Sequence, residues 1–297
     1  FPRYSEYYGT IKESGIGLAC EEAARIILSE NRPFSMETAA CDEEYEPSSE
    51  YDSSFALQIF AAREAVFKIL AKESLSIHEK LIVILDMGSK IQQCINTDEY
   101  DNIKSVVNDY LKEGIAHTLD ETRNLSDSGQ FEDISLQQGI RQILYPYEEM
   151  EVLNPEWEVI LKDIIDSLFE QMSDEEYNIL NEEFGTYMVS RAYEYRQLLE
   201  YLVFRYFAKS IYDYDFLGKC QMLVTNFFVI RQMDIIRWLD NHREYSFKDR
   251  MDVVHIFSRQ VEYSEDNIEN LYEDFIFDDI FKTDSLIAIL WIDSENI

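Results

Sequence analysis

The sequence predicts an all-α, multi-helical protein built from two packed helical halves. Only 9 Gly and 5 Pro interrupt the 297 residues, which suits long helices better than the turn-rich strands of a sandwich or barrel. In many segments apolar residues return at steps of three and four, as they do on one face of a helix. The hydrophobic content of 46% is typical of a globular chain and too high for a disordered one.

The first predicted region covers residues 1–120. Its first 19 residues are irregular and rich in tyrosine and glycine, which leaves room for one small β-hairpin. A helix is expected to start near Cys20, because Glu21 and Glu22 would lie in its first turn, where acidic side chains favour the helix dipole.

Further helices are expected after a loop at residues 31–54. The helical period begins at Phe55. Ser76 and Glu79 have the spacing of a capping box, so they predict the start of the next helix. A third helix is expected to end at Gly114.

A linker is predicted at residues 121–150, because the helical period weakens there and the run NLSDSGQFEDIS is polar. The second helical region would then be residues 151–297. Its centre, residues 188–240, is rich in Leu, Tyr, Phe and Ile and predicts two central helices, broken around residues 213–218.

The charge of the chain limits its partners. There are 59 Asp and Glu against 26 Lys and Arg, a formal net charge of −33. Such a surface repels nucleic acid and anionic membranes and attracts a basic protein or a lysine-bearing peptide. The alternative interpretation is that the acidic residues only keep the protein soluble. The longest uncharged apolar run, residues 220–230, is far shorter than the roughly 20 residues that span a bilayer. We therefore expect neither a nucleic-acid nor a membrane partner.

The cysteines indicate a reducing compartment. Cys20, Cys41, Cys94 and Cys220 show no CxxC or Cys/His spacing, so neither a disulfide framework nor a metal motif is predicted from them. We expect the protein to be cytoplasmic. Because the chain begins at Phe1 without an initiator methionine, we also expect residues upstream of it in the gene product.

Arg205 is a candidate site residue because it lies among aromatic and aliphatic neighbours in EYLVFRYFAKS. A partly buried guanidinium needs an acidic partner or a ligand. Glu200, Asp213 and Asp215 are the candidate partners close in sequence. A structural ion pair and a role in binding both remain open.

A second candidate is the polar face of the helix around Phe257. Phe257 and Val261 fall on its apolar side at 100° per residue, whereas His255, Arg259 and Glu262 fall on the opposite side. Such a face is either solvated or lines a cleft that another element covers.

Five segments together resemble one known family. They are Phe1-Pro2-Arg3, LACEEAARIIL (residues 18–28), FAAREAVFKILAKESLSIHEKLIVIL (60–85), LVFRYFAKSIYDYD (202–215) and FSRQVEYSEDNIENL (257–271). In order and spacing they are similar to segments of the bacterial flagellin lysine-N-methylase family. Glu21 stands where that family often has proline, and Tyr263 where it has histidine.

The resemblance implies methyl transfer from S-adenosylmethionine to the ε-amine of flagellin lysines. The amine must be neutral to react, although the pKa of a free lysine is about 10.4. A carboxylate or a tyrosine, such as Glu262 or Tyr206, would orient the amine or relay its proton. Arg205 and Arg259 would line the same cleft.

The resemblance also implies an iron–sulfur cluster in the full-length protein, held by cysteines upstream of Phe1. Cys20 would be a remaining ligand for this metal cofactor, and the cluster is not expected to assemble from this chain alone. Two other functions stay open: a non-catalytic acidic adaptor that binds a basic partner, and an iron–sulfur protein with a structural or redox role.

Overall fold

Helices dominate the computed structural model, which describes residues 3–32, 34–40 and 51–295. The predicted all-α class with one hairpin near the N-terminus is confirmed. The elements are β1 (Arg3–Tyr8), β2 (Ile11–Ile16), α1 (Glu21–Leu28), α2 (Ser53–Leu70), α3 (Ile77–Asn96), α4 (Ile103–Asp109), α5 (Ile115–Asp127), α6 (Leu136–Glu148), α7 (Pro155–Ile164), α8 (Asp174–Met188), α9 (Ala192–Tyr206), α10 (Ser210–Asp213), α11 (Phe216–Asp240), α12 (Phe247–Val261), α13 (Glu265–Phe277) and α14 (Thr283–Glu295).

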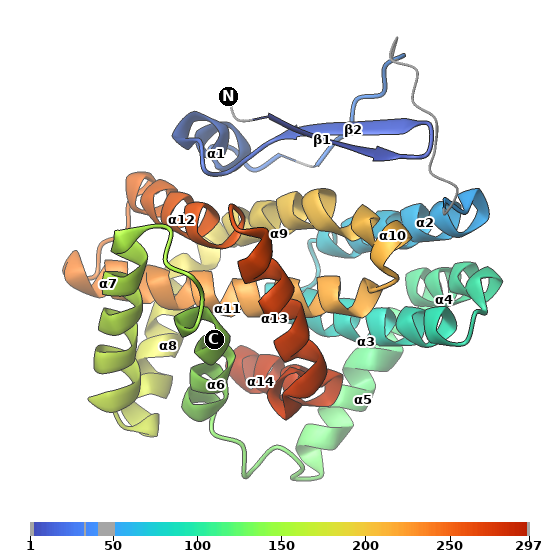
Figure 1. The fold of residues 1–297 in the computed structure, drawn as a ribbon. Helices are drawn as coiled ribbons and strands as arrows, with labels where there is room; N and C mark the ends of the chain where they lie inside the picture. The colour runs from blue at the N-terminus through green and yellow to red at the C-terminus, as the bar shows by residue number, and fades with distance from the viewer. Residues whose placement is uncertain (1–2, 33, 41–50, 296–297) are drawn as a thin grey trace.

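The hairpin and α1 form a layer of their own that lies across α9, α2 and α12 (Figure 1). Its strands are antiparallel and in register from the Arg3–Ile16 pair to the Tyr8–Ile11 pair. Gly9 in the turn has a φ of 61°, a conformation that glycine adopts without strain.

The buried ring of Tyr8 fixes the turn end of the hairpin to the helices. It stacks on Tyr212 at 5.9 Å between ring centroids and meets Phe60 edge-on at 6.0 Å. Aromatic pairs at these distances stabilise beyond the apolar area that they bury.

Helix α11 runs through the middle of the molecule (Figure 1). It contacts α3, α7, α9 and α12, and nearly all of its side chains are buried. The chain breaks before it at Tyr214, in the left-handed conformation, and Asp215, which caps the helix, so the predicted break between two central helices is confirmed.

Of two helix boundaries predicted in the first region, one agrees with the structure and one differs from it. The capping box of Ser76 and Glu79 starts α3 as predicted. Gly114, however, does not end a helix: its backbone is helical, and a π-helical turn over Tyr110–Gly114 leads directly into α5. The sequence rule failed because a glycine ends a helix only where its backbone turns left-handed.

Most of the range predicted to be a linker is helical. Within residues 121–150, α5 continues to Asp127 and α6 begins at Leu136. The apolar face of α6 is buried, and its side chains join those of both predicted halves in one core cluster. Gly139 and Pro146 lie inside α6, and because both residue types usually interrupt helices, the helical pattern of this segment is hard to recognise in the sequence.

No helix in the described ranges combines the length and the apolar character that crossing a membrane requires.

One buried ionic cluster joins α3, α8, α11 and α14. Asp293 is fully buried and lies 2.7 Å from Nε2 of His78 and 3.7 Å from Nε of Arg231, and it accepts a hydrogen bond from Asn181. Although burial alone would raise the pKa of the Asp293 carboxyl, the charge of Arg231 and the contacts with His78 and Asn181 lower it to about 2.

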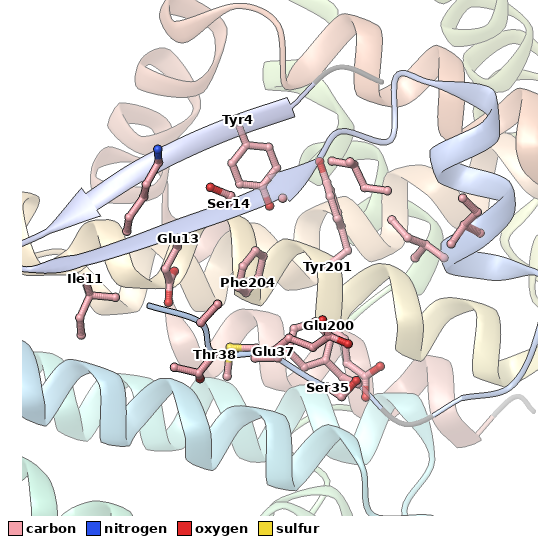
Figure 2. Close-up of a pocket in the computed structure, with 18 of the residues that line it drawn as sticks. Tyr4, Ile11, Glu13, Ser14, Ser35, Glu37, Thr38, Glu200, Tyr201 and Phe204 are labelled. Carbon is pink, nitrogen blue, oxygen red and sulfur yellow. The ribbon is translucent and has the colours of Figure 1, made fainter. Parts of the chain in front are cut away.

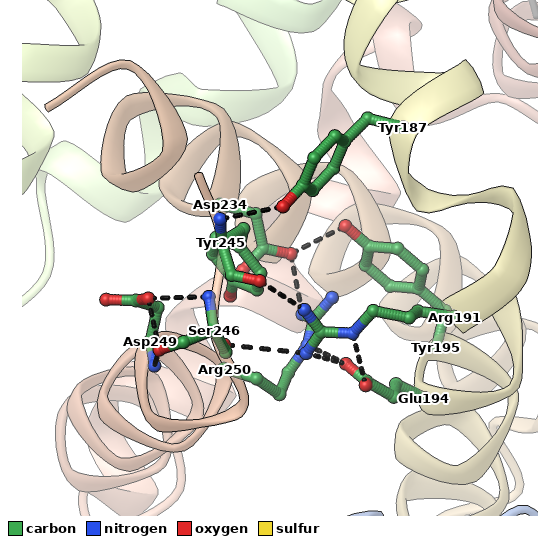
Figure 3. Close-up of polar contacts among 9 residues, drawn as sticks. All are labelled: Tyr187, Arg191, Glu194, Tyr195, Asp234, Tyr245, Ser246, Asp249 and Arg250. Carbon is green, nitrogen blue, oxygen red and sulfur yellow. Dashed lines mark hydrogen bonds and ion pairs between the residues drawn. The ribbon is translucent and has the colours of Figure 1, made fainter. Parts of the chain in front are cut away.

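A second buried cluster joins α9, α11 and α12 (Figure 3). Arg250 of α12 donates to Glu194 of α9 at 2.9 Å and to Asp234 of α11 at 2.6 Å. Tyr195 and Tyr245 each donate a hydroxyl hydrogen bond to the same Asp234. The three helices are thus tied together by matched charges rather than by apolar contact alone.

The Asp293 cluster yields a stability prediction. Asp293→Asn is expected to lower the free energy of unfolding by about 3–5 kcal/mol at neutral pH, because it leaves the buried Arg231 charge without its carboxylate. The folded-state pKa of about 2 lies below the ordinary value for Asp, about 3.9. The stabilisation is therefore present above about pH 4 and is lost as the pH falls towards 2.

Urea unfolding of the wild type and the variant between pH 2 and 7 measures both effects. Asp120→Asn, at an exposed position, is the matched control and is expected to leave the curve unchanged. An equally steep loss of stability below pH 4 in Asp293→Asn would contradict the assignment.

Candidate functional site

A cavity of about 1130 Å³ is enclosed by the hairpin, α1, residues 34–39 and α9. Strand β2 and residues 34–39 form two of its walls, and Tyr201 and Phe204 of α9 line it between them (Figure 2). Ile26 and Ile27 of α1 line it as well. A cavity of this size, with aromatic, apolar and a few charged side chains, has the character of a ligand site.

The hairpin wall is held to the helices by a nearly buried ion pair. Arg63 of α2 donates two hydrogen bonds to the Glu13 carboxylate of β2, at 2.7 and 2.5 Å. The guanidinium also lies over the rings of Phe60 and Phe204, with its central carbon 5.1 and 5.8 Å from their centroids. A two-pronged pair of this kind fixes the orientation of both groups.

Arg205 also reaches the hairpin. Its guanidinium lies 3.9 Å from the ring centroid of Tyr4 and 3.4 Å from the Glu6 carboxylate. The prediction of an acidic partner is right, but the partners expected from neighbouring positions are wrong. Glu200 pairs with Arg196, and both Asp213 and Asp215 pair with Lys219. Sequence spacing reveals only contacts within one helix, whereas Glu6 is 199 residues away from Arg205.

Glu262 is the buried acid of the site. Its Oε2 accepts a hydrogen bond from the Tyr201 hydroxyl at 2.7 Å and from the Tyr206 hydroxyl at 3.4 Å. Its Oε1 has no hydrogen-bond partner within the described part of the chain. Burial raises the pKa of the Glu262 carboxyl, although the hydrogen bond from Tyr201 partly opposes this.

Tyr201 connects that acid to the cavity. The residue lines the cavity, and its hydroxyl both donates to Glu262 and accepts from the backbone N–H of Leu18 at 3.4 Å. Burial and the neighbouring Glu262 raise the pKa of the phenol well above its usual value, so Tyr201 stays protonated. Sequence reasoning missed this residue among 20 tyrosines. Tyr201 lies four residues before Arg205, so the two share one helix face, and this spacing could have identified Tyr201 as a neighbour of the site.

The chain turns Glu262 inward by ending a helix there. Glu262 is the C-terminal cap of α12, and Ser264 then caps α13. The residues of the predicted polar face therefore lie in two different places, with Glu262 beside Tyr201 and Tyr206 and the others in a second depression. His255 and Arg259 line a separate depression of about 680 Å³, together with Arg237, and Arg259 is exposed.

Of the four predicted catalytic residues, the structure brings three together: Arg205, Tyr206 and Glu262. Arg259 lies apart from them in the second depression, where its functional role stays a prediction.

Cys20 lies at the N-terminal cap of α1 and is partly exposed. No set of three or more His, Cys, Asp or Glu side chains in the described residues is placed to hold a metal ion. Cys94 and Cys220 are buried within helices, where burial raises the pKa of both thiols, and Cys41 lies outside the described residues. The three cysteines in the described ranges do not fit an iron–sulfur cluster, since cluster ligands are thiolates gathered around one centre.

Most of the helical part of the chain matches the model of a known family. A family model described as the FliB lysine N-methylase C-terminal domain matches residues 63–289, more than half of the chain. The chain belongs to the FliB lysine N-methylase family. No curated protein and no solved structure matches it. In this FliB-type chain, the matched residues include Arg63, Tyr201, Arg205 and Glu262, whereas the hairpin and Cys20 precede them.

The Glu13–Arg63 pair yields a prediction about local stability. Glu13→Gln removes the charge that faces Arg63, so the hairpin is expected to detach more often while the helical core stays folded. Hydrogen exchange at residues 3–16 should become about ten- to a hundredfold faster, as follows from losing a charge-assisted bond. Exchange in α11 should not change.

Hydrogen exchange followed by mass spectrometry gives this measurement. Glu64→Gln, at a half-exposed position on the same helix as Arg63, is the matched control. If the hairpin and α11 exchanged faster together in Glu13→Gln, the pair would stabilise the whole fold rather than the hairpin.

Proposed function

We propose that this protein methylates lysine side chains of flagellin, or of another lysine-bearing protein, with S-adenosylmethionine as methyl donor. The observation that carries the proposal is the hydrogen bond from Tyr201, which lines a large cavity, to the Glu262 carboxylate behind it. Membership of a lysine N-methylase family supports the reaction class.

The chemistry requires that a lysine lose a proton before it reacts. Its ammonium group, with a free pKa of about 10.4, would meet the Tyr201 oxygen in the cavity. That oxygen takes the proton as Tyr201 passes its own proton to Oε2 of Glu262. The raised pKa of Glu262 makes it a stronger proton acceptor than an ordinary glutamate. The freed nitrogen lone pair would then bond to the methyl carbon as the bond between that carbon and the donor sulfur breaks, and the sulfur would keep the electron pair and leave as a neutral thioether.

The cavity suits a positively charged donor as well as a lysine. S-adenosylmethionine, when bound, supplies an electrophilic methyl group on a positively charged sulfur. The aromatic faces of Phe34 and Phe204 and the carboxylate of Glu37 line the cavity and would hold such a cation. Its volume exceeds what one lysine side chain needs.

The electrostatics favour a basic substrate. A net charge of −33 attracts lysine-rich surfaces and opposes binding to nucleic acid. A flagellin substrate would be met in the cytoplasm, before export. A protein that only bound such a partner would leave its lysines unmodified, so methylation itself separates the enzyme from an adaptor.

Two substitutions test the proton path. Glu262→Gln and Tyr201→Phe keep the side-chain shape but break the path, so each is expected to slow methylation by about a hundredfold or more. The measurement is mass spectrometry of flagellin after incubation with the full gene product and S-adenosylmethionine. Glu64→Gln, outside the cavity, should keep full activity.

Circular dichroism of each variant shows whether the fold is kept. Full activity in both variants would remove Tyr201 and Glu262 from the chemistry. Unfolding of Glu262→Gln alone would leave Tyr201→Phe as the decisive measurement.

The pH dependence gives an independent test. Methylation requires the Glu262 carboxylate, so the rate is expected to fall as the pH drops through the pKa of this group. Because burial raises that pKa, the midpoint of the fall should lie above about 4.3, the value for an ordinary glutamate. Tyr206→Phe removes a hydrogen bond that lowers the pKa, so the midpoint should move to higher pH. An unmoved midpoint in that variant would assign the fall to another group.

A further inference from the structure

Helix α13 ends in two apolar side chains that point into solvent. Ile276 and Phe277 are 75% and 78% exposed, the highest values among the large apolar side chains of the described residues. Phe275, by contrast, is buried and packs edge-on against Phe281 at 5.0 Å between ring centroids. Figure 1 shows that α13 starts beside α12 and runs away from the hairpin layer, so its last turn lies apart from the hairpin wall of the cavity. Adjacent exposed apolar side chains with a polar rim mark an interaction surface.

Four carboxylates surround the apolar pair. Glu273 and Asp274 lie within four residues of both apolar side chains on the same helix, and Asp278 follows them directly. Burial raises the pKa of the Asp274 carboxyl, and nearby negative charges raise it further. Those charges belong to Asp278, Glu273 and Glu149, the last of which caps α6. We call the exposed apolar pair and these four carboxylates the α13 tip.

No cation in the described ranges forms an ion pair with these four carboxylates. Residues 260–281 contain no Lys, Arg or His, and α6 and α11 are the long helices that pack against α13. Arg231 and Arg237 of α11 belong to the Asp293 cluster and to the second depression. The other cations of these elements and of the following turn already have partners: Arg141 pairs with Glu148, Lys219 with Asp213 and Lys282 with Asp279.

The acids at the end of α13 also oppose its helix dipole. The last carbonyl groups of a helix carry partial negative charge, which cations stabilise and anions destabilise. The last turn of α13 contains no basic residue, and Asp278 is its C-terminal cap. Local rules of this kind are broken mainly at functional sites. A cation that arrived from outside would relieve the conflict.

These features suit a basic amphipathic segment of another protein. Its apolar side chain would pack on Ile276 and Phe277, and lysine or arginine side chains beside it would pair with the carboxylates. A second copy of this chain is a poor occupant, because two α13 tips would bring like charges together. An anionic membrane is opposed on the same grounds.

We propose that the protein substrate docks on the α13 tip through a basic amphipathic segment, while a lysine elsewhere in the substrate enters the cavity. This inference rests on the proposed function, since it gives the same substrate a second contact. Helix α13 begins three residues after Glu262, and its 13 residues span about 20 Å. A docked segment therefore keeps the substrate tethered to the enzyme, which raises the local concentration of its lysines.

The double variant Ile276→Ser/Phe277→Ser tests the apolar contact. It should raise KM for flagellin about tenfold and leave kcat unchanged, because it removes binding that the ground state and the transition state share. The kinetics of the peptide acetyl-Ala-Ala-Lys-Ala-Ala-amide, which lacks a docking segment, should not change. Methylation by the full gene product is followed by mass spectrometry. Leu57→Ser, at a 68% exposed position of α2, is the matched control. An unchanged KM for flagellin in the double variant would overturn the proposal.

Two triple variants separate the α13 tip from the net charge of the protein. The first should weaken flagellin binding about tenfold and carries Glu273→Gln, Asp274→Asn and Asp278→Asn. The second should bind like the wild type and removes as many charges from exposed positions of α7 and α8: Glu158→Gln, Asp163→Asn and Glu175→Gln. Bio-layer interferometry with the full gene product, without methyl donor, gives the dissociation constants. Equal weakening in both variants would contradict docking at this place.

Binding and methylation together distinguish this inference from the proposed function. Flagellin that binds through the α13 tip but stays unmethylated would refute the proposed function and leave the docking surface standing. Methylated flagellin with the same KM in every variant would do the reverse. Hydroxyl-radical footprinting should show Phe277 protected only when flagellin is added. Protection in the full gene product alone, or a dimer that Ile276→Ser/Phe277→Ser dissociates, would assign the surface to another occupant and overturn the proposal.

Discussion

The fold depends on matching the charges of one buried helix. Helix α11 is enclosed by the rest of the chain, yet its C-terminal half carries two buried charged residues, Arg231 and Asp234. Unpaired charges in such surroundings are strongly destabilising, so their partners determine which helices lie against α11 and in which register. Arg250 of α12 forms an ion pair with Asp234, and Asp293 of α14 forms one with Arg231.

The same charge matching sets the geometry of the site. Arg250 binds Glu194 as well as Asp234, which locks α12 against α9. Tyr201 lies two turns beyond Glu194 on α9, and Glu262 ends α12. A rigid link at one end of this helix pair therefore places a phenol and a carboxylate 2.7 Å apart at the other end, without any contact between the link and the cavity. Positioning groups on helices in this way holds them more firmly than loops would.

Local patterns in the sequence were enough to predict the helical class, the capping box at Ser76 and the break before α11. These features depend on neighbours within a few residues. The partner of Arg205 and the inward turn of Glu262 depend on the docking of the hairpin and on the end of α12, which no local period encodes. Helical periodicity placed both Glu262 and Arg259 on one polar face, but it stops applying where α12 ends, so the structure brings only Glu262 to Tyr206 and Arg205 and leaves Arg259 in a separate depression.

The hairpin differs from the α9 wall of the cavity in its relation to the family match. It precedes the residues that the family model matches, whereas Tyr201 and Glu262 lie within them. It is attached to the helices by the ion pairs of Glu6 and Glu13 and by the buried ring of Tyr8. One wall can therefore vary in sequence without disturbing the helices that hold Tyr201 and Glu262. In an evolutionary sense, the hairpin wall of the cavity and the Tyr201–Glu262 pair are carried by separable parts of the chain, so relatives can diverge in the first while retaining the second.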